Sequence, residues 1–288
     1  MGNILFVVWR ESLEAVLIVS ILYSFIKKGI VQGKVEVRSL SYVWGGVAAG
    51  IALSSLLAVA TVGVQDSLQG RALDYFQTTV LFVSALLMTQ MVVWMNEHGK
   101  KIKTKLESDV TEASKHSGHW GVAIVAALAV AREGAELVVY LYSLVLENKG
   151  LGASGVAALT ALGIALALFT VWSFSKGIKF ISYPLFFRVT SMALLFSAAG
   201  LVVNGTNRLI EMDLLPSLVD PIWNTSAVLD GHGVFGGIVS AFTGYRARPS
   251  LMLVLIYTGY WLLTFIWMKR EAITAALGFR SEIQLGQA

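Results

Sequence analysis

Apolar residues occur along this chain in seven long blocks, and most polar and charged residues lie between the blocks. The blocks are residues 4–26, 42–64, 76–95, 120–146, 153–174, 186–204 and 251–268. Each is close to the ~20 residues that a helix needs to cross the hydrocarbon core of a bilayer. A barrel strand is about half as long and alternates apolar with polar positions, which these blocks do not. The pattern predicts an all-α integral membrane protein with seven transmembrane helices.

The composition agrees with a lipid environment. Of 288 residues, 56% are hydrophobic and 14% are charged, whereas soluble proteins carry about 25% charged residues. The net charge is +4, but the basic residues form no continuous stripe on a surface helix, so nucleic acid is not an expected partner. The chain has no cysteine, which excludes thiolate metal ligands and disulfide bonds.

The Lys and Arg residues between the blocks indicate the orientation. Fifteen of them fall in loops on one side of the predicted membrane, and the other side has Arg71, Lys149, Arg208, Arg246 and Arg248. Loops rich in Lys and Arg stay in the cytoplasm. We therefore expect a multi-pass protein of the cell (inner or plasma) membrane, with the N-terminus and the loop 205–249 outside and the C-terminus in the cytoplasm.

One charged motif occurs twice. Arg10-Glu11-Ser12-Leu13-Glu14 in the first block recurs as Arg132-Glu133-Gly134-Ala135-Glu136 in the fourth. Because each repeated unit has three predicted spans, an odd number, the second copy is inverted in the membrane, as in many transporters. We expect one domain, 1–288, made of repeat 1 (about 1–97), repeat 2 (about 118–210), the outer loop and a seventh helix (about 250–268).

The spacing within each motif places its three charged side chains on neighbouring turns of one side of a helix. A charge at the bilayer centre costs about 2.5–3.5 kcal/mol on insertion scales, so these groups must face one another, water or a cation. Four carboxylates against two guanidinium groups leave a net charge of about −2, which favours a cation site. The alternative is structural: each Arg pairs with the Glu four residues later and joins helices.

Oxygen ligands suit hard ions such as iron, calcium, manganese or magnesium. Other residues are weaker candidates for contact with an ion. Met88, Met91 and Met95 share one face of the third block, but Met is usually a core residue. Hydroxyl groups at helix contacts also often serve packing alone. The remaining candidates are Thr78, Thr79, Thr190, Ser191, Asp230 and His232 near the path or the outer mouth, and His98, His116 and His119 on the inner side.

The doubled Arg-Glu-x-x-Glu motif in a seven-span protein resembles the oxidase-dependent iron permease family, in particular its bacterial EfeU-like branch. Trp94-Met95 with His98, Trp223-Asn224-Thr225-Ser226, and the segment from Gly244 to Ser250 are similar to that family as well. The resemblance covers nearly the whole chain. It implies iron import, with Glu11, Glu14, Glu133 and Glu136 handling the metal and Arg10 and Arg132 as their charge partners.

The predicted function is therefore high-affinity iron import, with iron as the transported substrate and no bound cofactor. No nucleotide loop or activated nucleophile indicates an enzyme. The resemblance implies separate outside-facing partners, namely a multicopper oxidase or cupredoxin-like and haem-containing delivery proteins. Two alternatives remain: a carboxylate-site transporter of another divalent metal such as lead or manganese, and a membrane metal sensor.

Overall fold

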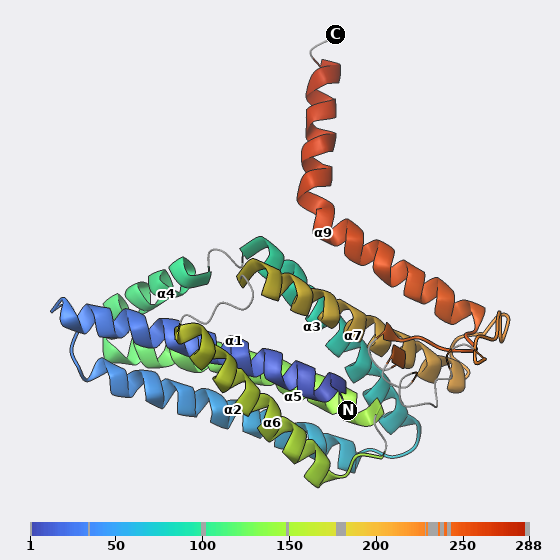
Figure 1. Ribbon diagram of the computed structural model, residues 1–288, viewed down its shortest axis with the longest axis horizontal. Helices are drawn as coiled ribbons and strands as arrows, with labels where there is room; N and C mark the ends of the chain where they lie inside the picture. The colour runs from blue at the N-terminus through green and yellow to red at the C-terminus, as the bar shows by residue number, and fades with distance from the viewer. Residues whose placement is uncertain are drawn as a thin grey trace. The chain divides into compact units, whose positions relative to one another are not determined.

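The structure is a computed structural model that describes residues 2–33, 35–98, 102–147, 150–176, 183–227, 229, 236, 239–240 and 243–285. These residues contain eight long helices and no β-strand, so the all-α prediction is confirmed (Figure 1). The helices are α1 (Gly2–Val31), α2 (Ser39–Ser67), α3 (Arg71–His98), α4 (Ile102–Ser117), α5 (His119–Glu147), α6 (Ala153–Ser175), α7 (Tyr183–Glu211) and α9 (Leu251–Leu285). Each of the seven predicted blocks lies inside one of them.

Five of these helices are long and apolar enough to cross a membrane: α2, α3, α6, α7 and α9. On α2 the apolar side chains point outward, with Val59 70% and Leu56 65% exposed, as expected of a helix that contacts lipid. Helices α1 and α5 have 30 and 29 residues, long enough to span. They are not among the five apolar helices, because each carries the three charged residues of a motif. The count of seven spans therefore stays a prediction.

Helix α4 corrects the prediction for the segment between the third and fourth blocks, which the sequence predicts to be a plain inner loop. Its composition is polar, but Leu106 and Val110 are four residues apart and lie on one face. Val110 is 1% exposed and packs with Leu22 and Ile26 of α1. This short apolar stripe is too small to count as a block, yet it attaches a helix to the ends of α1 and α5.

By its internal contacts the chain divides into two compact units, Met1–Ser84 with His98–Leu194, and Ala85–Glu97 with Leu195–Ala288. In the first unit, α2 packs on α5, α5 on α1, and α1 on α6 (Figure 1). The second helix of each predicted repeat therefore packs on the first helix of the other repeat. Helix α2 lies against α5, the motif helix of repeat 2, and α6 lies against α1, the motif helix of repeat 1.

Glycine makes both of these contacts close. A Cβ atom at Gly50 of α2 would lie 2.8 Å from the Cβ of Val130 and the carbonyl oxygen of Ala127 on α5. A Cβ atom at Gly163 of α6 would lie 2.7 Å from Cγ1 of Val8 on α1. Such distances are too short for any larger residue, so the backbones approach as they do in small-residue membrane contacts.

The second unit has a polar and aromatic core of its own. The Tyr260 hydroxyl group of α9 donates to the carbonyl oxygen of Leu195 at 3.2 Å and lies 3.0 Å from the Thr89 hydroxyl group. The rings of Phe196 and Trp261 meet edge to face with centroids 4.9 Å apart. These contacts hold α9 against the later part of α7 and the end of α3.

Candidate metal centre

The first motif lies on α1, whose side chains here are almost completely buried. Nη1 of Arg10 is 2.8 Å from Oε1 of Glu11, and Nη2 is 2.7 Å from Oε1 of Glu14. The first contact is a hydrogen bond, and the second is an ion pair without hydrogen-bond geometry. The three side chains are 2%, 1% and 6% exposed. One guanidinium group therefore holds both carboxylates of its motif in an environment from which water is excluded.

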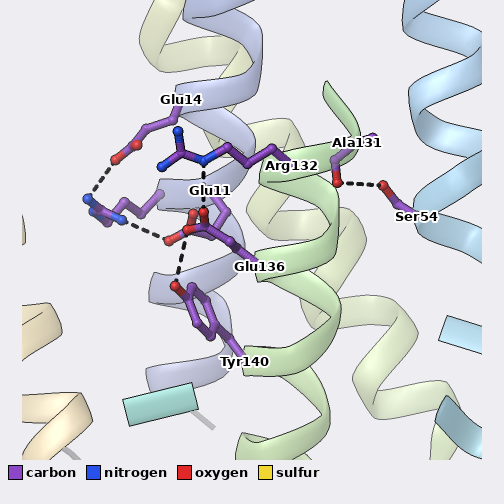
Figure 2. Close-up of polar contacts among 8 residues, drawn as sticks. Glu11, Glu14, Ser54, Ala131, Arg132, Glu136 and Tyr140 are labelled. Atoms are coloured by element: carbon purple, nitrogen blue, oxygen red, sulfur yellow. Dashed lines mark hydrogen bonds and ion pairs between the residues drawn. The ribbon is translucent and has the colours of Figure 1, made fainter. Parts of the chain in front are cut away.

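The second motif, on α5, is more open. Nε of Arg132 donates to Oε1 of Glu136 at 3.1 Å, with side chains 48% and 13% exposed. The buried Tyr140 hydroxyl group donates to the other oxygen of Glu136, also at 3.1 Å. Figure 2 shows Arg132 extending from α5 towards α1, with the Glu136 carboxylate beneath it and Tyr140 below. Identical motif letters thus occupy two different environments.

The two helices bring three of the four predicted glutamates together. One carboxylate oxygen from each of Glu11, Glu133 and Glu136 lies within 4.8 Å of the other two. Metal–oxygen distances of about 2.3 Å place ligands on opposite sides of an ion about 4.6 Å apart, so one ion fits this spacing. We call these three residues the carboxylate cluster. Glu14 is not in it, because its side chain is turned to Arg10 (Figure 2).

Glu133 is the least satisfied member of the cluster. Its side chain is 4% exposed, and among the described residues no donor forms a hydrogen bond to its Oε2 atom. Oε2 of Glu11 is likewise buried without a hydrogen bond from the residues that the structure describes. Buried carboxylates in proteins are normally paired or bind a metal. Glu133 and the second oxygen of Glu11 therefore have acceptor capacity that the described residues leave unused, and a cation could use it.

The contacts of α5 with α2 position the second motif. Gly134, inside the motif, faces Ser54 so closely that a Cβ atom there would collide with the hydroxyl group. The Ser54 hydroxyl group donates to the carbonyl oxygen of Gly50 at 2.9 Å and lies 3.5 Å from that of Ala131 (Figure 2). Because α2 occupies this side of α5, the glutamates must project towards α1.

Sequence reasoning missed Tyr140. Its signal was available, because it follows Glu136 by four residues and therefore lies on the same face of α5. A buried Tyr that donates to a candidate ligand orients that ligand, as outer-shell groups do in metal sites. The first motif has an apolar residue, Ile18, at the corresponding place after Glu14.

The weaker candidates lie elsewhere. Thr78 and Thr190 are buried, Ser191 is half-buried and Thr79 is exposed. Met88 and Met91 are buried in the second unit, and Met95 is half-buried. His119 contacts Glu36 at 3.2 Å and Ser39 at 2.9 Å. Asp230 and His232 lie outside the described residues, as do the side chains of His98 and His116. None of the candidates that the structure describes contributes to the carboxylate cluster.

Comparison with known proteins decides the family. Residues 1–280 match the model of the iron permease FTR1 family. The chain belongs to this family. It is 30% identical to the ferrous iron permease EfeU of Escherichia coli O6:K15:H31 over 277 residues, which cover 93% of this chain and 96% of the relative. It is 28% identical to the ferrous iron permease EfeU of Yersinia pestis over 256 residues, 88% of each chain. No solved structure matches.

The family membership confirms the resemblance read from the doubled motif. It is a transporter family and not a known family of enzymes. Together with the five apolar helices, it makes this chain a multi-pass membrane protein.

Proposed function

We propose that iron crosses this iron permease through the carboxylate cluster of Glu11, Glu133 and Glu136. The observation that carries the proposal is the convergence of these three carboxylates from two helices within 4.8 Å of one another. Glu11 and Glu133 are buried and Glu136 is 13% exposed, and gathering three carboxylates in such a place is unfavourable unless a cation joins them. A purely structural ion pair would need only one carboxylate for each guanidinium group.

Glu14 is the fourth ligand in this proposal, and it pairs with Arg10 when no ion is bound. Nη2 of Arg10 and Oε1 of Glu14 are 2.7 Å apart, and in this proposal Glu14 exchanges this partner for the ion. Arg10 and Arg132 act as charge partners that occupy the glutamates when no ion is present. They also prevent the site from binding an ion so tightly that it cannot leave.

The charge of the site favours ferrous iron. Four carboxylates and two guanidinium groups sum to −2, which a divalent ion neutralises. Oxygen ligands suit hard and borderline ions, and the chain has no cysteine for a softer one. The relatives from Escherichia coli and Yersinia pestis are named ferrous iron permeases. Manganese and lead share the charge and remain the competing substrates.

The seven spans and the inverted repeat belong to the same proposal. Glycine contacts support the repeat, because Gly50 packs on Val130, two residues before Arg132, and Gly163 packs on Val8, two residues before Arg10. Equivalent positions of the two copies thus make equivalent contacts. An inverted pair of three-helix units, 1–97 and 118–210, with the seventh helix outside the repeat accounts for this pattern.

For the orientation we propose an outer N-terminus and a cytoplasmic C-terminus, from the fifteen-to-five bias in basic residues. Single cysteines at Ser108 of α4 and Ser217 after α7 test this, since the chain has none of its own. On intact cells an impermeant thiol reagent should label position 217 and not 108. The opposite labelling would reverse the assigned direction.

We also propose that the chain has no resident cofactor and does no redox chemistry itself. Oxidation or delivery of iron would fall to separate outside-facing proteins, a multicopper oxidase or cupredoxin-like and haem-containing partners. The basis is the resemblance to oxidase-dependent permeases. Purified protein that moves iron into liposomes with no other protein present would agree with this division of work.

Uptake by liposomes that contain the purified protein tests the function. Radiolabelled ferrous iron should accumulate inside, and unlabelled iron should compete better than manganese or lead. Stronger competition by manganese or lead would assign the carboxylate site to that metal. Binding of iron without any accumulation would instead favour the sensor.

A further inference from the structure

A cavity of about 240 Å³ lies between α1 and α4, away from the carboxylate cluster. This volume is far above the roughly 10–15 Å³ that one water molecule requires. The residues that line it include Leu17, Ser20, Ile21, Ser24 and Lys28 of α1 and Glu107 of α4. It is open on one side and mainly apolar in its lining, with two hydroxyl groups, one ammonium group and one carboxylate, and it is large enough for a hydrated ion.

The cavity continues the face of α1 that carries Arg10 and Glu14 of the first motif. At 100° per residue, positions 10, 14, 17, 21, 24 and 28 stay within about 40° of one direction. Arg10 and Glu14 therefore share a face with Leu17, Ser24 and Lys28. Leu17 is only about 4.5 Å along the helix from Glu14, and Lys28 is about 21 Å from it. The face runs from the buried ion pair to the end of the helix with its Lys residues.

Helix α4 is a fixed wall of this cavity. Its Val110 is buried in a cluster with Leu22, Ile26, Val122 and Ala126 of the neighbouring helices. At the turn into α5, a Cβ atom at Gly121 would collide with the backbone of Ala113. These contacts set the position of Glu107, which lies three residues before Val110.

The charged groups of the cavity do not neutralise each other. Among the residues that the structure describes, neither Glu107 nor Lys28 has an ion-pair or hydrogen-bond partner for its side chain. The half-buried carboxylate of Glu107 therefore lines the cavity without a partner among the described residues. Lys28 is exposed at the far end of the cavity.

We propose that this cavity is the exit chamber on the Lys-rich side, where Glu107 receives the iron ion that leaves the carboxylate cluster. The inference rests on the proposed function. A transported ion must dissociate from three or four carboxylates. It dissociates faster when another carboxylate and water molecules are close enough to bind it. Ser20 and Ser24 add hydroxyl oxygens. Lys28 at the mouth repels the ion and opposes its passage, so the attraction that draws the ion from the cluster comes from Glu107.

Replacing Glu107 tests the chamber, with Glu112 of the same helix as the matched control. Glu112 is exposed and does not line the cavity. Glu107→Gln should lower the initial rate of iron uptake into liposomes at least fivefold and change the iron affinity of the cluster less than twofold. Glu112→Gln should match the parent in both. Parental uptake by Glu107→Gln overturns the proposal.

A parallel Glu133→Gln variant separates this failure from failure of the proposed function. If Glu133→Gln loses iron binding while Glu107→Gln transports normally, the exit chamber alone is wrong. If Glu133→Gln binds and transports iron like the parent, the carboxylate cluster is not the iron site. The proposed function and the exit chamber are then both wrong.

A second experiment uses the absence of cysteine. Ser24→Cys places a thiol in the cavity, and Thr111→Cys places one on the exposed side of α4. Reaction with a bulky thiol reagent should stop uptake at position 24 only, and iron should slow that reaction. Lys28→Gln should keep or raise the uptake rate. Unchanged uptake after modification at position 24 overturns the proposal. A lower uptake rate in Lys28→Gln also overturns it, and would indicate that the cavity binds an anion such as a lipid phosphate.

Discussion

Glu133→Gln should stabilise the protein when no metal is present. The substitution keeps the shape of the side chain and removes its charge. Glu133 is 4% exposed, and no described residue donates a hydrogen bond to its Oε2 atom, so no observed partner is lost at that atom. A neutral amide in its place relieves repulsion with Glu11 and Glu136.

The magnitude follows from the spacing of the cluster. At an effective dielectric constant of about 20, two unit charges 4.8 Å apart repel by about 3.5 kcal/mol. Glu133 faces two such charges, which are already paired with Arg10 and Arg132. The guanidinium groups offset most of the repulsion, and we expect a net gain of about 1–2 kcal/mol. A rise of about 2–4 °C in Tm for each kcal/mol is then expected.

The assay is thermal unfolding of the purified protein in detergent, with and without ferrous iron. Iron at about 100 times its Kd should stabilise the parent by about 2.7 kcal/mol. Glu133→Gln should lose most of this stabilisation, because the cluster then lacks one of its three carboxylates. Glu112→Gln, an exposed substitution on α4, serves as the control and should behave like the parent.

The structural alternative makes the opposite prediction. If Glu133 were part of an ion-pair network that only holds α1 to α5, its neutralisation would destabilise the metal-free protein by several kcal/mol. A lower Tm without metal, together with an unchanged response to iron, would refute the role of Glu133 as a metal ligand.

Three further substitutions test individual contacts. Arg10→Lys keeps the charge but loses the planar fork that reaches two carboxylates, so iron should still bind while uptake slows; parental uptake would show that only net charge matters. Tyr140→Phe removes the donor to Glu136 and should weaken iron binding about 10–100-fold with about 1 kcal/mol lost in stability, and an unchanged affinity in titrations would exclude the orienting role. Gly50→Leu should destabilise the α2–α5 contact by about 1–3 kcal/mol or more, whereas Gly45→Leu, at an open position, should be nearly neutral in thermal unfolding.

Much of the site could be predicted from sequence because its determinants are local. The i and i+4 spacing of Arg10 and Glu14, and of Arg132 and Glu136, produces the two ion pairs on any helix. The apolar blocks were long enough to define the helices that carry them. These features depend on helix geometry and need no knowledge of tertiary contacts.

The rest depends on packing between helices, which the motif letters do not encode. Arg10 is 2% exposed and Arg132 is 48% exposed, although both begin the same motif. For the same reason Glu14 stays with Arg10 while Glu136 joins the cluster. Helix α4 was missed because only two apolar residues, Leu106 and Val110, mark its buried face. These residues are buried only through contacts with α1 and α5.

The most direct test of the carboxylate cluster is uptake of radiolabelled ferrous iron by liposomes that contain equal amounts of folded parent, Glu11→Gln, Glu133→Gln or Glu112→Gln protein. The cluster draws its ligands from both α1 and α5. Loss of uptake is therefore predicted for Glu11→Gln and for Glu133→Gln separately, with parental uptake for Glu112→Gln. Parental uptake by either cluster variant would contradict the claim that the two motifs together handle the transported iron.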